Sequence, residues 1–234
     1  MTKIKSILLA LTTLAAVSTS APAAEGVILL HGMCRTPASM VRMQRALEAE
    51  GFVVANVGYP SRSAGTESLS EAAIGGALDR PELRTCTKIH FVTHSLGGIL
   101  VRSYFSRHAH GRLGRVVMLG PPNQGSELVD RLGHWWLFGK LNGPAGLELG
   151  TAASSTPNRL GPLAFDCGVI AGDRSINWIN STMIAGPDDG KVSVERTRVA
   201  GMRDHLTVHS AHPFIAANRS AIAATLRFLR HGAF

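Results

Sequence analysis

The chain has 234 residues, of which 45% are hydrophobic and 17% are charged; this balance fits one folded globular domain and excludes an intrinsically disordered chain. The formal net charge is +8 at pH 7, but the basic residues are scattered, without a basic run or interleaved aromatic residues, which argues against a nucleic-acid-binding protein. A basic surface is compatible with contact at an anionic membrane surface, although solubility is the simpler reason for it.

Residues 1–23 have the pattern of a secretory signal peptide. Lys3 and Lys5 give a basic start, residues 7–17 are mostly apolar, and a cleavage site of the small-x-small type follows at 21–23. The apolar run is too short to span a bilayer comfortably, which disfavours a membrane anchor. We therefore expect an exported protein, periplasmic or secreted, with a single domain at residues 24–234.

Short apolar runs alternate with helical patterns along this domain. Thr36 is expected to cap the first helix, with Pro37 at its first position and Gly51 after its end. Such alternation indicates parallel β-α-β units, and so an α/β fold with helices on both faces of the sheet. The predicted strands are 27–30, 52–57, 89–93, 116–119, 168–171 and 205–209, and the other predicted helices are 66–78, 97–107 and 219–230.

The run FVTHSLGG at 91–98 is the most informative motif. An apolar strand, a serine at a tight turn and a glycine that opens a helix are typical of a nucleophile elbow, which exposes the hydroxyl of Ser95. The turn needs small residues on both sides of the serine; Gly97 meets this need, and Thr93 meets it less well.

A second apolar strand, at 26–30, ends in His31-Gly32. This is the expected place of the other half of an oxyanion hole, whose two donors would be the backbone amides of Met33 and Leu96. His31 is expected to brace its loop rather than to transfer protons.

A serine hydroxyl needs a base, usually a histidine, to take its proton. In an elbow fold the acid and the histidine follow the serine along the chain. His212 lies just beyond the last predicted strand, where the base should be, and is the preferred candidate. His209 is the reserve candidate, His205 is expected to be structural, and His94 is not required for this chemistry.

The residues alone leave the acid open. Asp173 directly follows the strand at 168–171, and Asp189 lies in the turn PDDGKV at 187–192. Asp188 could serve if the register shifts by one residue. A plain solvated turn is the alternative reading of this run.

The segment 121–166 contains no predicted strand and leaves the carboxyl end of one, where ligands bind in open α/β sheets. It is expected to be a cap or lid in which Trp135, Trp136 and Phe138 line an apolar substrate pocket; a packed irregular loop is the alternative.

Three cysteines follow residue 23. Cys86 and Cys167 both precede strands, so they would lie at the same edge of a parallel sheet, whereas Cys34 follows a strand. This favours a Cys86–Cys167 disulfide in an exported protein. No cysteine or histidine group has metal-ligand spacing, and we expect neither a metal nor another cofactor.

Taken together, these motifs resemble those of bacterial α/β-hydrolases of the lipase and esterase type, including small lipases and a deacylase-like group whose elbow reads THSLGG. The matching pieces are 27–32, 91–102, 115–123, 189–192 and 212–214. Thr93 replaces the first elbow glycine, a change that such relatives tolerate. The resemblance implies a minimal α/β-hydrolase fold that lacks the two opening strands of larger members. It would have a mostly parallel sheet of six to seven strands and a short cap or lid insertion.

The resemblance also implies that Ser95 is the nucleophile and His212 the base, and it favours Asp189 as the acid because such lipases carry their aspartate in an Asp-Gly-x-Val turn. We therefore expect an exported serine hydrolase that cleaves carboxylic esters of lipids or of medium-chain acyl groups. The alternatives are a thioesterase or amide-type acyl hydrolase with the same triad, and a non-catalytic exported lipid-binding protein. The sequence does not indicate the oligomeric state.

Overall fold

The structure, a computed structural model, describes residues 23–234. Apart from its last residue, the expected signal peptide lies outside this range. The described residues form a six-stranded sheet in which every pairing is parallel and the strand order is β2-β1-β3-β4-β5-β6. The predicted parallel sheet with helices on both faces is confirmed.

Each strand predicted from an apolar run is present, with ends that differ by at most three residues. The strands are β1 (Glu25–Leu30), β2 (Val53–Val57), β3 (Lys88–His94), β4 (Leu113–Leu119), β5 (Cys167–Gly172) and β6 (Asp204–Val208). The helices are α1 (Val41–Ala49), α2 (Thr66–Ser70), α3 (Gly76–Leu78), α4 (Leu96–Phe105), α5 (Glu127–Leu132), α6 (Trp136–Leu147), α7 (Thr156–Arg159), α8 (Trp178–Ser181) and α9 (Arg219–His231). Short helical turns are η1 (Pro37–Met40), η2 (Glu71–Gly75), η3 (Pro81–Leu83), η4 (Glu195–Thr197) and η5 (His212–Ala217). No helix in this part of the chain has the length and apolar character needed to cross a membrane.

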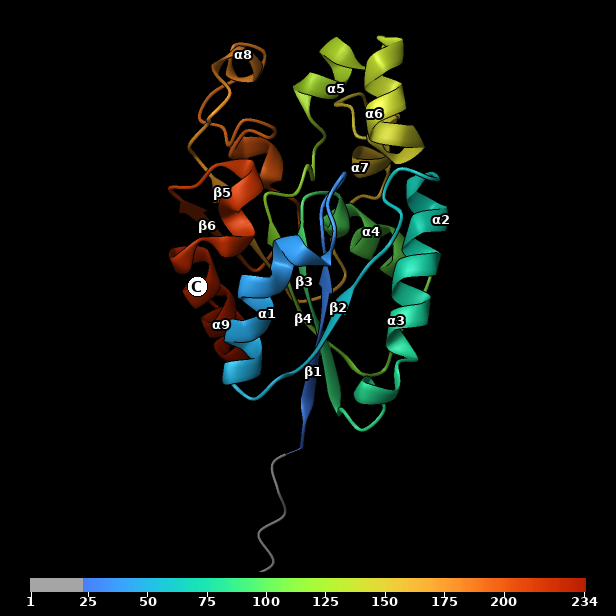
Figure 1. Cartoon of the computed structure of the whole chain (residues 1–234), viewed down its shortest axis with the longest axis vertical. Coiled ribbons are helices and arrows are strands. Elements are labelled where there is room, and N and C mark those ends of the chain that lie inside the picture. The colour runs from blue at the N-terminus through green and yellow to red at the C-terminus, as the bar shows by residue number, and fades with distance from the viewer. Residues whose placement is uncertain (1–22) are drawn as a thin grey trace, which may run out of the picture.

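Helices cover both faces of the sheet (Figure 1). Side chains alternate along a strand, so Val27 and Leu29 of β1 join the apolar cluster formed with α1 and α9. Ile28 and Leu30 join the cluster formed with α2, α3 and α4. All four side chains are fully buried. Because burial of one such side chain contributes about 1.5–3 kcal/mol, β1 is held in the centre of the molecule from both sides.

The beginnings of two helices differ in how they are capped. Thr36 is at the N-cap position of η1, but its side chain makes no capping hydrogen bond, so the expected side-chain cap is wrong. The Thr36 carbonyl instead accepts a hydrogen bond from the Ser39 hydroxyl at 2.8 Å. At α9 the Asn218 side chain does cap the helix, by accepting from the Ala221 amide at 3.1 Å.

The segment 121–166, between β4 and β5, contains α5, α6 and α7 and no strand. It lies at the carboxyl ends of the strands, at the top of Figure 1. The guanidinium of Arg102, from α4, is buried and ties the segment down. It donates to the carbonyls of Asn123 at 2.8 Å, Pro157 at 2.9 Å and Gly161 at 2.8 Å. One buried side chain therefore holds both ends of the excursion against the α/β core.

The predicted disulfide is wrong, because Cys86 and Cys167 are both free thiols in the structure. Cys86 precedes β3 and Cys167 begins β5, so both do lie at the starting edge of the sheet. However, β4 lies between those strands. Two strand spacings amount to about 10 Å, which exceeds the Cα separation of about 7 Å that a disulfide tolerates.

Candidate active site

Ser95 occupies the turn between β3 and α4 with φ 53° and ψ −120°, a left-handed conformation that is uncommon for a residue with a side chain. Its amide donates to the Leu119 carbonyl at 2.9 Å, which fixes the turn against β4. The turn also depends on Gly97, where a Cβ atom would lie 2.8 Å from the Leu30 carbonyl oxygen. This geometry is that of the nucleophile elbow predicted from the motif.

Two hydrogen bonds join Ser95 to a histidine and an aspartate that are far away in sequence. His212 Nε2 lies 3.0 Å from Ser95 Oγ, and His212 Nδ1 lies 2.7 Å from Asp189 Oδ2. With the imidazole proton on Nδ1, His212 donates to the carboxylate and accepts the serine O–H. Such a chain of hydrogen bonds prepares a hydroxyl for proton removal.

The Asp189 carboxylate is buried and held by backbone groups. Its Oδ1 accepts hydrogen bonds from the amides of Lys191 at 3.0 Å and Val192 at 2.9 Å. The His212 amide donates to the Asp189 carbonyl at 2.8 Å. Asp189 and His212 are therefore fixed to each other by both side chain and main chain.

Gly120, directly after β4, makes room for this pair. Its φ is +54°, and a Cβ atom there would lie 3.0 Å from Asp189 Oδ2 and 3.3 Å from His212 Nδ1. A side chain at this position would press on the hydrogen bond between Asp189 and His212.

The loop after β1 lies against the elbow. A Cβ atom added to Gly32 in this loop would be 3.2 Å from the Ser95 Cβ. Met33 is the next residue of this loop. Leu96 is the first residue of α4, so its amide has no acceptor within the helix. The assignment of the Met33 and Leu96 amides as oxyanion donors stays a prediction.

His31 holds the loop that carries Met33. Its ring stacks on Tyr59 with centroids 4.2 Å apart, and the Tyr59 hydroxyl donates to the His31 carbonyl at 2.6 Å. These contacts agree with a bracing role for His31.

The reserve candidates have other partners. His209 Nδ1 lies 3.0 Å from Asp173 Oδ1, and this pair is exposed. Asp188 Oδ1 accepts from the Ser181 hydroxyl at 2.9 Å and from an amide of its own turn at 2.7 Å. Asp188 thus shapes the turn from which the neighbouring Asp189 reaches His212.

His94, immediately before Ser95, makes a contact that sequence reasoning missed. Its Nε2 lies 3.0 Å from the His212 carbonyl oxygen, and the two rings have centroids 4.8 Å apart. Burial lowers the pKa of His94 well below its usual value, so the neutral ring donates this bond from Nε2. A contact across 118 residues leaves no local pattern in the sequence. The available signal for it was the position of His94 beside Ser95.

Replacing His94 by phenylalanine is expected to lower kcat for ester hydrolysis by about 10- to 100-fold with little change in KM, because His212 loses the donor that positions its backbone. His94→Gln keeps an N–H donor near the Nε2 position and should recover most of the activity. Steady-state kinetics and thermal melts of both variants check this. Equal losses in the two variants would contradict a positioning role.

Acidification is expected to destabilise the fold. Burial lowers the pKa of His31, His94 and His205 below 6.5, so below that pH the unfolded chain binds protons that the folded chain does not. The free energy of unfolding therefore has its full value above pH 6.5. It falls as the pH drops below 6.5, by up to about 1.4 kcal/mol per pH unit for each such histidine. Urea unfolding between pH 7.5 and 5 measures the slope, and a flat profile would contradict it.

The aromatic residues of the excursion are largely at the surface. Trp135 is 57% and Trp136 is 76% exposed, whereas Phe138 is half-buried. A cavity of about 490 Å³ beside α5 and α7 is lined by His134 and not by these three residues. The expectation that they line a substrate pocket stays a prediction.

The sheet order, the elbow and the covering helices define the class of fold: the chain has the α/β-hydrolase fold. No family model matches the chain, and no curated protein sequence does.

Among solved structures, the mature form of the Bacillus licheniformis lipase BlEst2 is similar, with a TM-score of 0.68 and 19% identity over 93% of this chain and 96% of that one. The propeptide form of that lipase gives a TM-score of 0.73 at 19% identity over 91% of this chain, which spans about half (52%) of that longer chain. The phospholipase PlaB from Legionella pneumophila gives 0.68 at 20% identity, over 89% of this chain and 59% of that one. The shared property at these identities is the fold.

Proposed function

We propose that the protein is an exported serine hydrolase that cleaves carboxylic esters through an acyl-enzyme on Ser95. The observation that carries this proposal is the hydrogen-bonded chain from Ser95 through His212 to Asp189. Ser95 lies at the elbow between β3 and α4 of this α/β-hydrolase fold, and a serine at such a turn acts as a nucleophile.

In the first half-reaction Ser95 Oγ bonds to the ester carbonyl carbon while His212 Nε2 takes the hydroxyl proton. The Asp189 carboxylate stabilises the resulting imidazolium. The amides of Met33 and Leu96 would hold the negative carbonyl oxygen. When the tetrahedral intermediate collapses, the alcohol leaves with the proton from His212, and the acyl group stays on Ser95.

In the second half-reaction a water molecule attacks the acyl carbon and gives its proton to His212. The carboxylic acid is released and Ser95 regains its proton, so no cofactor is needed. Because water is the second substrate, the kinetics are expected to be of the ping-pong type.

Lipids or medium-chain acyl esters are the proposed substrates. Solved structures with this fold include proteins named as lipases, a carboxyl esterase and a phospholipase, and Trp136 offers an exposed apolar surface on the segment 121–166. A thioester would use the same machinery and is the nearest alternative.

Hydrolysis of p-nitrophenyl esters from acetate to palmitate tests the proposal, together with labelling by a fluorophosphonate probe. We expect labelling of Ser95 and a chain-length optimum above acetate. Higher activity on matched thioesters would favour a thioesterase. No turnover at any length, with no labelling, would favour a lipid-binding protein.

Export rests on the sequence pattern of residues 1–23. Expression of the full chain in a bacterium, followed by N-terminal sequencing of the product outside the cytoplasm, should give a chain that begins at or beside Ala24. Retention of the whole chain in the cytoplasm would contradict export.

A further inference from the structure

The exposed apolar side chains of the described residues are gathered at one end of the molecule. Nine large hydrophobic residues are exposed, and eight of them lie on α6, on α8 or just before these helices. The ninth, Phe214, is two residues after His212. Monomeric soluble proteins rarely gather exposed apolar groups in this way, and such gatherings mark interaction sites. We call this set, at the carboxyl ends of the strands, the apolar rim.

One side of the rim is attached to the loop beside the nucleophile. The Cys34 thiol donates to the Leu141 carbonyl of α6 at 3.3 Å. Near the end of α6, a Cβ on Gly146 would lie 3.0 Å from the Met33 side chain. Helix α6, with the exposed Trp136 and Leu141, therefore flanks the loop that carries Met33.

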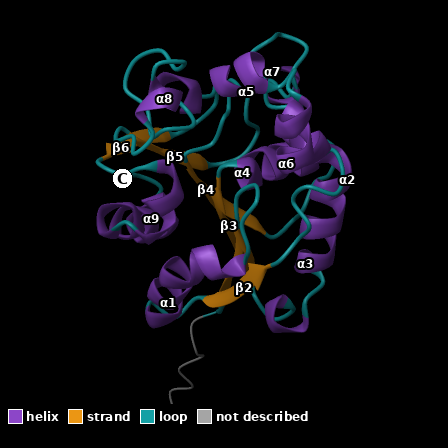
Figure 2. Ribbon diagram, turned by 45° about the horizontal axis from the view of Figure 1, so that its top comes forward, coloured by secondary structure: helices purple, strands orange, loops and turns teal. Residues whose placement is uncertain are grey.

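The other side of the rim is attached to the turn that carries the acid. The Asn180 side chain of α8 donates to the Gly190 carbonyl at 3.0 Å, and Ser181 donates to Asp188. Helix α8 exposes Trp178 to 75%. Figures 1 and 2 show α6 and α8 on opposite sides of the carboxyl edge of the sheet. The two apolar helices thus lie on either side of the Ser95 site.

The segments that carry or adjoin the rim are basic, and two exposed acids, Asp130 and Asp173, lie just outside them along the chain. These four segments are 31–36, 58–65, 132–147 and 174–187. None of them contains an aspartate or glutamate, and each has a single lysine or arginine, which is exposed. These residues are Arg35, Arg62, Lys140 and Arg174. The Lys140 ammonium lies 5.8 Å from the centre of the Trp136 ring, so a cation and an aromatic ring are presented together.

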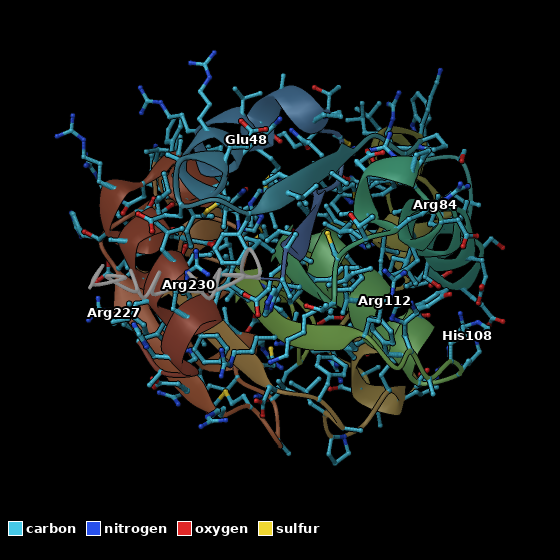
Figure 3. The ribbon with its side chains drawn as sticks, turned by 90° about the horizontal axis from the view of Figure 1, so that it is seen from below. Glu48, Arg84, His108, Arg112, Arg227 and Arg230 are labelled. Carbon is cyan, nitrogen blue, oxygen red and sulfur yellow. The ribbon has the colours of Figure 1, made fainter. Side chains whose placement is uncertain are left out.

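The opposite end, seen in Figure 3, has a different character. Arg84, Arg227 and Arg230 share that end with acidic residues such as Glu48, and none of the nine exposed apolar side chains lies there. Scattered charges of both signs are the usual surface of a soluble protein. The gathering of exposed tryptophans and aliphatic groups beside basic residues is therefore specific to the rim.

We propose that the apolar rim docks the protein onto an anionic lipid surface, with the Ser95 site facing the lipid. Tryptophan is favoured at the boundary between water and lipid. Lysine and arginine beside it can reach anionic headgroups while their stems stay in apolar contact. Docking itself does not depend on the proposed function, but delivery of an ester from the lipid to Ser95 does.

A second copy of this chain fits the rim less well than lipid does. Pairing about a two-fold axis would bring the same patch from both copies together. The four basic segments of one copy would then face the same four segments of the other, which contain no acidic residue. An anionic lipid surface supplies the missing negative charge.

Intrinsic fluorescence gives a direct test, because Trp135, Trp136 and Trp178 are the three tryptophans of the chain and all belong to the rim. The Ser95→Ala protein is mixed with vesicles of phosphatidylcholine alone or with phosphatidylglycerol, so that no turnover alters the lipid. We expect a blue shift of the emission and quenching by brominated lipid, both stronger with the anionic vesicles. No shift with either vesicle would overturn the proposal.

Variants separate the two contributions. Trp136→Ala and Trp178→Ala should each weaken vesicle binding, measured by sedimentation, by about tenfold. Lys140→Gln and Arg174→Gln should each weaken binding to anionic vesicles by about fivefold, whereas Arg84→Gln and Arg227→Gln, at the opposite end, should not. Equal effects at both ends would overturn the proposal. So would a dimer, seen by sedimentation velocity, that the tryptophan variants dissociate while no vesicle binding is found.

The two proposals fail in different ways. Vesicle binding by the Ser95→Ala protein, together with no ester turnover by the unmodified chain, would leave docking standing and remove the hydrolase. Turnover of soluble esters without vesicle binding would do the reverse.

Discussion

Replacing Ser95 by alanine is expected to lower kcat for ester hydrolysis by at least about 10⁴-fold, because the acyl-enzyme route then has no nucleophile. His212→Ala should lower kcat by about as much, because the Ser95 hydroxyl then lacks the base that lies 3.0 Å from it. The double variant should be no slower than either single one, because residues that act as a unit are not additive. Initial rates with p-nitrophenyl butyrate measure all three.

Ser106→Ala is the matched control. Ser106 is an exposed serine at the end of α4, so its loss should leave kcat unchanged. Ser95→Ala should also keep its melting temperature, because a left-handed turn held by a backbone bond from residue 95 to Leu119 does not need the hydroxyl. If Ser95→Ala kept a tenth of the activity, the nucleophile would have to be another residue.

The strands were predictable because a parallel strand is buried on both faces and reads as a continuous apolar run. β1 illustrates this: residues 27–30 are apolar and fully buried, and two of them belong to each core. The ends were less predictable. β4 begins at Leu113, three residues before its apolar run, because the pairing with β3 extends past Gly114 and Arg115 to Leu113, which pairs with Ile89 across a register shift.

Much of the site was predictable because parallel strands bring their carboxyl ends to one edge. Ser95 follows β3, and His212 lies four residues after β6; sequence position therefore identified the residues that meet. The choice between Asp188 and Asp189 did not follow from the residues alone. It depends on which of two adjacent side chains turns towards His212, and the resemblance to lipases decided it.

Contacts that depend on strand order could not be read from the sequence. A Cys86–Cys167 bridge fits two strand beginnings, but the order of the sheet puts β4 between them. The bond from His94 to the His212 carbonyl likewise exists because β3 and the turn after β6 end at the same place. The position of α6 against the Met33 loop is of the same kind.

Asp189→Asn is expected to lower kcat by about 10⁴-fold with little change in KM. The carboxylate fixes the His212 proton on Nδ1 through the 2.7 Å contact, and an amide that presents its NH₂ group there would stabilise the opposite tautomer. Nε2 would then carry the proton and could not accept one from Ser95. Steady-state kinetics on the same ester, with a thermal melt to confirm folding, measure the effect.

Two neighbouring aspartates serve as matched controls for Asp189. Asp188→Asn removes a buried carboxylate that accepts from Ser181 and from its own turn, so it should lower stability and reduce kcat by less than about tenfold. Asp173→Asn changes an exposed partner of His209 and should alter neither stability nor kcat. A larger loss of kcat from Asp188→Asn than from Asp189→Asn would mean that the acid is the residue one position earlier. In that case the 2.7 Å contact to His212 would not describe the working enzyme, whereas the elbow and its serine would still stand.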